Sequence, residues 1–173
     1  MAILPVRLYG DPVLRRRSER VDTVTPEIEA MLDAMVETMH ASVGIGLAAT
    51  QVGIERRMLV LDEGKGVVGA YLNPVIVELG GTQVAEEGCL SLPGIYADVR
   101  RAEWVVVEAQ DRIGAAIRRR AGGLVARVFQ HEIDHLDGVL FIDRIDRVTR
   151  DRIKRRIKRE GFPEDAHAGV GAL

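Results

Sequence analysis

The clearest periodic pattern in the sequence lies at residues 26–41. Apolar side chains recur there at the three- and four-residue spacing of one helix face: Ile28, Met31, Leu32, Met35 and Met39. Thr25 suits an N-cap, and Pro26 suits the first helical position. The pattern therefore predicts an amphipathic helix over residues 26–41.

Short apolar runs rich in β-branched residues follow in the middle of the chain, at residues 58–62, 71–79 and 104–111. They are typical of strands, and the Gly and Asp residues between them suit hairpin connections. Helical patterns return at residues 124–136 and 147–160. Because the strands are clustered rather than alternating with helices, we predict an α+β fold. In it, antiparallel strands would pack around a central helix at 124–136.

Length and composition indicate one small domain. The chain has 173 residues, of which 47% are hydrophobic, and this is enough to form a single core. We interpret residues 1–146 as the body of the domain and residues 147–173 as a basic helix and frayed tail of the same domain. No apolar run reaches the ~18 residues of a transmembrane helix, and the start lacks the apolar stretch of a signal peptide. A single cysteine fits a reducing compartment, so we expect a cytoplasmic protein with no membrane partner.

The net charge of −2 hides an uneven distribution. Residues 147–160 contain eight Lys or Arg and two acidic residues, so this segment carries +6 and the rest of the chain −8. The acidic body argues against binding to DNA. A charge run on a terminal helix is most often a solvated face. The alternative is that its basic side chains contact a nucleic acid.

The segment HEIDH, residues 131–135, carries the most chemical information. His131 and His135 are four residues apart in a predicted helix, so both imidazoles would lie on one face and could bind one metal ion. Glu132 lies beside the first ligand, where its carboxylate could take a proton from a water that the metal activates. The alternative is a partly exposed helix that carries two histidines by chance, and this spacing makes it the weaker interpretation.

The only cysteine in the chain is the candidate for a third ligand. Cys89 lies in the segment EEGCLSLPG, next to predicted strands. A thiolate binds zinc or ferrous iron well. Free cysteine is more commonly a small buried hydrophobic residue, but beside HEIDH we favour the ligand. Three protein ligands would leave a fourth position open, as in catalytic rather than structural sites.

The glycine-rich segment GIGLAATQVG, residues 44–53, first suggests a dinucleotide site. Residues 44–49 match G-x-G-x-x-A, but that motif requires a strand before it and a helix after it. Here a helix precedes it, so we reject the dinucleotide interpretation. The small residues would instead let the backbone approach a bound peptide closely. Gln51 offers an amide donor to an oxyanion, the alternative being a solvated loop residue.

Three segments together resemble the peptide deformylase family. The family motifs G-x-G-x-A-A-x-Q, E-G-C-L-S and Q-H-E-x-D-H stand here in order, at residues 44–51, 87–91 and 130–135. The resemblance implies a hydrolase that removes the formyl group from the N-terminal formylmethionine of newly made chains and releases formate. It also implies one divalent metal ion, natively Fe²⁺, with Zn²⁺ or Ni²⁺ as substitutes.

The resemblance further implies a role for individual residues. Cys89, His131 and His135 would hold the metal, and Glu132 would act as general base and later as proton donor. The side chain of Gln51 and the backbone N–H of Leu90 would stabilise the oxyanion. The pocket for the methionine side chain would be formed by Ile45, Leu124 and Val128, and the backbone of Gly46 would pair with the extended substrate.

Two other functions fit part of the pattern. A general metalloprotease shares HExxH, but such enzymes usually have a third His or Glu ligand rather than Cys. A non-catalytic metal-binding module would not need Glu132.

Two further contacts are expected. We predict an ion pair between Glu87 and Arg101. The family resemblance also implies that residues 147–160 contact the ribosome.

Overall fold

The computed structural model describes residues 2–162 and residue 173. In this part of the chain the α-helices are α1 (Pro26–Ala41), α2 (Gly123–Leu136) and α3 (Arg147–Glu160). The strands are β1 (Gly46–Ala48), β2 (Met58–Asp62), β3 (Val68–Gly80), β4 (Gln83–Cys89), β5 (Leu92–Arg101), β6 (Trp104–Gln110) and β7 (Ala116–Gly122). Short 3-10 helices are η1 (Pro12–Arg15), η2 (Ala49–Val52) and η3 (Phe141–Arg144).

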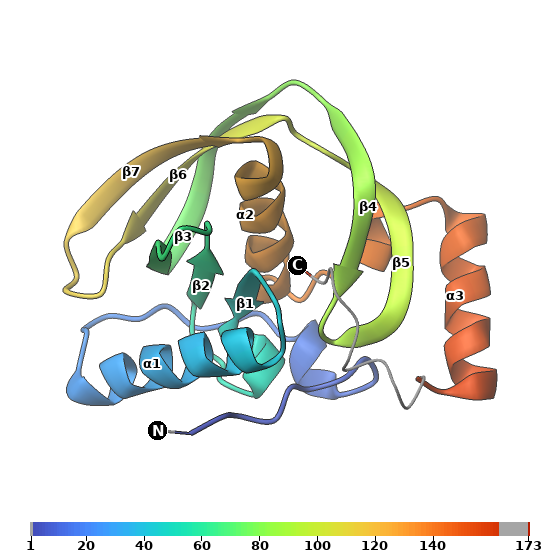
Figure 1. Cartoon of the computed structure of the whole chain (residues 1–173), viewed down its shortest axis with the longest axis horizontal. Coiled ribbons are helices and arrows are strands. Elements are labelled where there is room, and N and C mark those ends of the chain that lie inside the picture. The colour runs from blue at the N-terminus through green and yellow to red at the C-terminus, as the bar shows by residue number, and fades with distance from the viewer. Residues whose placement is uncertain (1, 163–172) are drawn as a thin grey trace.

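The strands form two antiparallel sheets with α2 between them. One sheet has the strand order β1-β2-β3-β6-β7, and the other is the β4–β5 hairpin. Figure 1 shows α2 in the middle of the molecule, with the larger sheet on one side, β4–β5 on the other and α3 outside β5. β1 is an edge strand of the larger sheet and pairs with β2.

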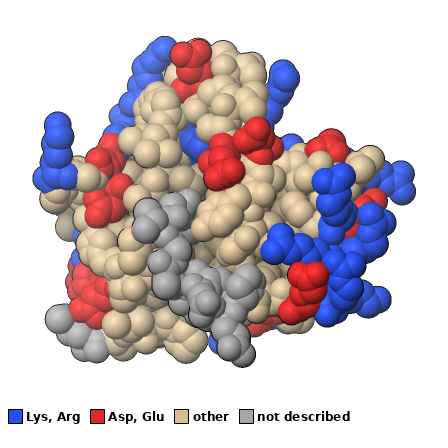
Figure 2. Space-filling model, turned by 45° about the vertical axis from the view of Figure 1, so that its right-hand side comes forward, with Lys and Arg blue, Asp and Glu red and all other residues tan. Residues whose placement is uncertain are grey.

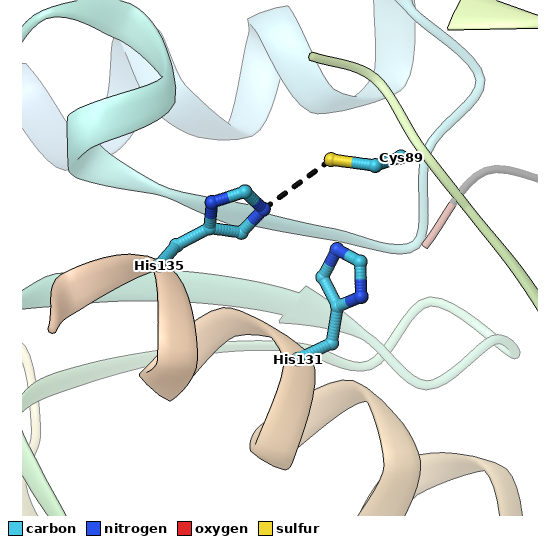
Figure 3. Close-up of side chains that lie close together, drawn as sticks. All are labelled: Cys89, His131 and His135. Carbon is cyan, nitrogen blue, oxygen red and sulfur yellow. Dashed lines mark hydrogen bonds between the residues drawn. The ribbon is translucent and has the colours of Figure 1, made fainter. Parts of the chain in front are cut away.

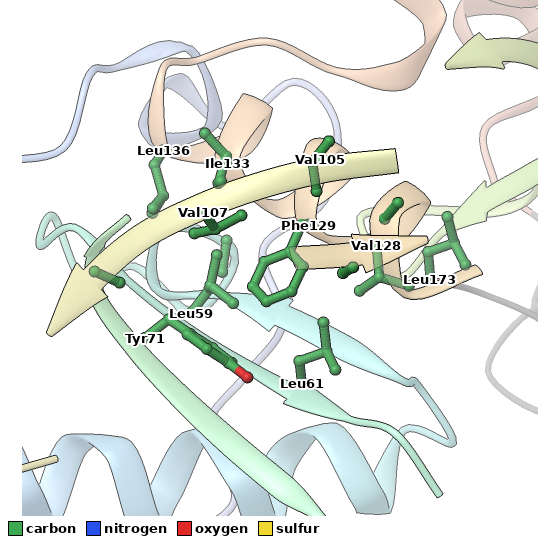
Figure 4. Packing of buried hydrophobic residues seen from close by; sticks show 14 residues of the cluster. Leu59, Leu61, Tyr71, Val105, Val107, Val128, Phe129, Ile133, Leu136 and Leu173 are labelled. Carbon is green, nitrogen blue, oxygen red and sulfur yellow. The ribbon is translucent and has the colours of Figure 1, made fainter. Parts of the chain in front are cut away.

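The apolar face of α2 packs on the larger sheet and forms the main core. The ring of Phe129 meets that of Tyr71 edge-to-face, with the two centroids 4.8 Å apart. Around this pair lie buried side chains from β2, β6 and α2 (Figure 4): Leu59, Leu61, Val107, Ile133 and Leu136. This packing fixes the position of α2 and, with it, of the HEIDH segment.

β2 is apolar on both faces because a helix covers each of them. Leu59 and Leu61 pack in the cluster around α2. The alternate residues Met58 and Val60 pack in a second cluster with the buried face of α1, which includes Met35. Strand side chains alternate between faces, so this continuous hydrophobic run is what a strand buried on both sides requires.

α3 packs on the β4–β5 side of the molecule. Ile153, Ile157 and Phe162 are partly buried against a third cluster, which contains Cys89. Figure 2 shows Lys and Arg side chains gathered over this side of the surface. Residues 163–172, most of the predicted frayed tail, lie outside the described residues. Leu173 is described, and it is buried in the cluster around α2 rather than frayed.

The predicted α+β fold is confirmed. α1 and α3 have the predicted bounds, and α2 begins one residue before the prediction. The sequence pattern does not predict β1, β4, β5 or β7. β7 reads AIRRRAG and is mostly exposed, so its pattern carries little of the apolar signal on which strand prediction depends. No described helix is long and apolar enough to cross a membrane.

Candidate metal centre and active site

α2 and the end of β4 bring the candidate catalytic side chains into the interior. His131, Glu132 and His135 on α2 are each at most 1% exposed. Cys89 is the last residue of β4 and is also buried. It lies just before the tight turn into β5, so its side chain is fixed by the hairpin rather than by a flexible loop.

The three predicted metal ligands lie together (Figure 3). Sγ of Cys89 is 3.3 Å from Nε2 of His135, and one ligand atom from each of Cys89, His131 and His135 lies within 4.8 Å of the others. At zinc bond lengths of ~2.0–2.3 Å, two ligands in a tetrahedral arrangement stand ~3.5 Å apart. Within the described residues, Nε2 of His131 has no hydrogen-bond partner. The donor set and its spacing therefore fit one metal ion.

Glu87 orients the first histidine. Its Oε1 is 2.8 Å from Nδ1 of His131, and Arg101 donates to both its oxygens at 2.9 Å, which confirms the predicted ion pair. Burial raises the pKa of Glu87, but the hydrogen bonds from Arg101 and His131 outweigh it and lower the pKa to about 2. An ionised carboxylate can only accept, so Nδ1 of His131 carries the hydrogen and Nε2 is left for a metal.

Glu132 is a buried carboxylate without a hydrogen-bond partner. Neither of its oxygens has one within the described residues, and burial raises its pKa to about 7. A carboxyl group with that pKa can accept or donate a proton at neutral pH. Burial lowers the pKa of His135 well below its ordinary value. His135 is therefore neutral, the form in which imidazole binds a metal.

Gln51 is fully buried in η2, so the solvated alternative does not hold. Its Nε2 is 3.5 Å from Sγ of Cys89 and 3.3 Å from Oγ of Ser91. Its Oε1 accepts a hydrogen bond from the backbone N–H of Ala48 at 3.0 Å. Because the oxygen is held in this way, the NH₂ donors of Gln51 point toward the candidate metal centre.

Three of the four residues predicted to bind substrate lie together. A Cβ at Gly46 in β1 would be 2.6 Å from Cγ1 of Val128 and 2.9 Å from Oε1 of Glu132. Ile45 is partly buried against the cluster that contains Val128. Leu124 differs, because it lies in the first turn of α2 and is 58% exposed. The structure does not place it in the same cluster.

The last residue of the chain also lies here. Leu173 packs in the cluster that contains Val128 (Figure 4), and its backbone N–H donates to the carbonyl of Gly88 at 3.4 Å. Gly88 directly precedes Cys89. Nothing in the sequence indicated this contact, because it joins residues far apart in the chain.

Comparison with known proteins decides the family. The sequence profile described as "Polypeptide deformylase" matches residues 3–151. The chain belongs to the polypeptide deformylase family. Peptide deformylase of Halothermothrix orenii is 46% identical over 155 residues, which cover 88% of this chain and 100% of that one. Peptide deformylase of Xylella fastidiosa strain 9a5c is 47% identical over 165 residues, covering 92% and 97%.

Solved deformylase structures have the same fold. The structure from Thermus thermophilus matches with a TM-score of 0.87 at 44% identity, covering 91% of this chain and 95% of that one. The structure from Ehrlichia chaffeensis in complex with actinonin matches with a TM-score of 0.85 at 36% identity, covering 92% and 99%. Deformylases are metal-dependent hydrolases that act on the formylated N-termini of nascent chains, and this chain is one of them.

Two residues of the site were missed by sequence reasoning. Ser91 stands in the E-G-C-L-S motif and contacts Gln51. Arg127 is 2% exposed and contacts Glu87. A signal for Arg127 was present, since it lies four residues before His131 and therefore on the same face of α2.

Proposed function

We propose that this protein removes the formyl group from N-terminal formylmethionine with a divalent metal held by Cys89, His131 and His135, and with Glu132 as general base. The main support is the convergence of three ligand atoms within 4.8 Å of one another. Beside them stands a buried carboxylate that has no hydrogen-bond partner among the described residues. A structural metal site would have no use for that carboxylate.

Glu132 carries the proton transfers. A bound divalent ion would lower the pKa of water toward neutrality and polarise the formyl oxygen. The carboxylate of Glu132 accepts a proton from the attacking water, and it then donates this proton to the nitrogen as the C–N bond breaks. Formate and a free amine are released. A pKa of about 7 suits both transfers at neutral pH.

Gln51 and Leu90 are assigned to the oxyanion. The amide of Gln51 is held by Ala48 and lies 3.5 Å from the sulfur of Cys89, which brings its donors close to the metal centre. The backbone N–H of Leu90 belongs to the residue directly after Cys89. Donors fixed before the reaction stabilise developing negative charge without having to reorganise.

We place the substrate between β1 and the end of β4. β1 is an edge strand of the larger sheet, so the backbone of Gly46 can pair with an extended peptide. Leu173 supports this placement: its N–H reaches the carbonyl of Gly88 at 3.4 Å, and its side chain packs near Val128. A methionine side chain would occupy the same place, against Ile45 and Val128, with Leu124 at its exposed end.

Two assays test this function. Formyl-Met-Ala-Ser should be hydrolysed and its acetylated analogue should not, whereas equal turnover of the two would point to a general amidase or protease. Glu132→Ala should keep the metal but lose ~10²–10⁴-fold in kcat. If Glu132→Ala kept full activity, a non-catalytic role for the carboxylate would be established instead.

We propose that the native metal is Fe²⁺, as the resemblance to the family implies. One thiolate and two imidazoles suit ferrous iron, zinc and nickel, so ligand type alone does not choose among them. Ferrous iron beside a thiolate is sensitive to oxygen. Anaerobic purification followed by elemental analysis should show iron, with activity that decays in air. Zinc or nickel as the main metal, with activity that is stable in air, would contradict the assignment.

We further propose that the protein acts in the cytoplasm and contacts the ribosome through α3. The helix carries eight Lys or Arg, while Ile153 and Ile157 pack inward. Changing its exposed residues Arg152, Arg155 and Arg159 to Glu preserves this packing. The variant should lose affinity for ribosomes at low salt and keep its turnover of short formyl peptides. Unchanged ribosome affinity would make α3 a solvated face only.

A further inference from the structure

Arg127 is a buried arginine for which the proposed function has no role. It is 2% exposed and among the largest fully buried side chains of the described residues. Arg127, His131 and His135 follow one another at four-residue spacing, so they lie along one face of α2. A buried charge costs free energy unless it is paired. The partners of Arg127 therefore indicate why the charge is there.

The guanidinium of Arg127 joins α2 to the β4–β5 hairpin. Its Nη1 donates to Oε2 of Glu87 and to the backbone oxygen of Val99, the latter at 3.0 Å. Its Nη2 lies 3.5 Å from the backbone oxygen of Gln83. One side chain of α2 therefore contacts both strands of the β4–β5 hairpin, in which Cys89 is the last residue of β4.

Each oxygen of Glu87 has two partners, and Arg127 is one of them. Oε1 accepts from Nη2 of Arg101 at 2.9 Å and lies 2.8 Å from Nδ1 of His131. Oε2 accepts from Nε of Arg101 at 2.9 Å and from Arg127. Arg101 belongs to β5 and reaches α2 only through its hydrogen bond to Asp134, at 2.7 Å. Arg127 belongs to α2 itself, so it holds Glu87 directly against the helix that carries His131.

We propose that Arg127 is a positioning residue for the metal ligand His131. By holding Glu87 against α2, it keeps the Glu87–His131 hydrogen bond aligned, so that Nε2 of His131 is directed at the metal. This inference rests on the proposed metal site. The competing explanation is that Arg127 only ties α2 to the hairpin. In that case its loss would change the stability of the fold and leave the affinity for metal unchanged.

Metal affinity separates the two explanations. The probe is Co²⁺ alone, with its dissociation constant measured by competition with a chromophoric chelator at fixed pH. Arg127→Met should weaken Co²⁺ binding ~10-fold, the usual effect of losing an outer partner of a ligating histidine. Arg127→Lys keeps a cation near Glu87 but lacks the guanidinium group that also donates to the backbone oxygen of Val99. It should weaken Co²⁺ binding ~3-fold.

Arg119→Met is the control. Arg119 is a partly buried arginine that donates to Glu63 at 2.7 Å and to the hydroxyl of Tyr71 at 2.5 Å, and it shares no partner with Glu87. Its loss should leave Co²⁺ affinity within ~2-fold of the parent. A lower melting temperature with unchanged Co²⁺ affinity in Arg127→Met would overturn the proposal. If that variant does not fold, Arg127→Lys decides, and parental affinity in it would overturn the proposal as well. A parent protein that fails to bind Co²⁺ would contradict the proposed metal site itself.

Discussion

Gly46 of β1 and Val128 of α2 approach so closely that the contact leaves no room for a side chain at residue 46. A Cβ there would be 2.6 Å from Cγ1 of Val128, and 2.9 Å from Oε1 of Glu132. This contact sets the distance between the edge strand proposed to bind the peptide and the helix proposed to carry out the chemistry. It therefore bears on stability and catalysis together.

Gly46→Ala is expected to destabilise the protein by ~1–3 kcal/mol, because the added methyl overpacks the contact with Val128. It should also lower kcat/KM, since the same methyl displaces Glu132. Urea denaturation and a formyl-peptide assay measure the two effects. Adding Val128→Ala should recover part of the stability but not the activity, because the clash with Glu132 remains. A Gly46→Ala protein that matches the parent in both assays would show that β1 moves away without cost.

Gln51→Leu should lower kcat by ~10²–10³-fold with a small change in KM, as expected for loss of one oxyanion donor. Leucine keeps the size of the side chain but donates no hydrogen bond. Ser91→Ala is the control, because it removes a partner of Nε2 of Gln51 and leaves the donor in place. Its kcat should stay within a few-fold of the parent. If Gln51→Leu kept its kcat within a few-fold of the parent, Gln51 would act only by packing.

The parts of the site that could be predicted from sequence are those set by local geometry. His131 and His135 share a helix face because of the helix period, and Glu132 follows from its place beside the first ligand. Thiolate chemistry and the lack of any other cysteine favour Cys89 as the third ligand, and the family resemblance implies the same role. Local geometry does not show that it meets the histidines, since 42 positions separate Cys89 from His131 and no local rule joins a strand end to a distant helix.

The remaining parts depend on tertiary pairing. Arg127 looks unfavourable on a buried helix face until β4 brings Glu87 to it. Leu124 fits the helical apolar pattern, yet it is exposed because it lies in the first turn of α2, before the helix enters the core. The three arginines of β7 remove the apolar pattern by which a strand is predicted from sequence. In the structure β7 pairs with β6, and Arg118 lies opposite Glu108 and donates to it. Such cross-strand pairing is not visible in either segment alone.

Glu132→Gln should make the protein more stable once its metal has been chelated, and increasingly so as pH rises. The pKa of Glu132 is about 7 in the fold against 4.5 for the free side chain. Below pH 4.5 both states hold the proton, and no difference is expected. Between 4.5 and 7 the unfolded chain ionises first, which favours unfolding of the parent. Above pH 7 the difference in the free energy of unfolding between Glu132→Gln and the parent should level off at ~3 kcal/mol.

Urea midpoints measured from pH 4 to pH 8 test this expectation. Gln51→Leu, treated in the same way, is the reference, because it changes a neutral side chain of the same site and should show no such pH dependence relative to the parent. A constant stability difference between Glu132→Gln and the parent across this range would mean that Glu132 has the same pKa in the fold as in the unfolded chain.

Removal of the metal should lower the melting temperature, and Cys89→Ser should abolish this effect. A ligand that binds only the folded state stabilises it by ~2.7 kcal/mol when present at 100 times its dissociation constant. The parent, stripped with a chelator, should therefore regain its melting temperature on addition of Zn²⁺. Serine is nearly the size of cysteine but is a poor ligand for zinc, so Cys89→Ser should fold and melt at one temperature with or without Zn²⁺. An equal rise in parent and variant would show that the metal binds without Cys89.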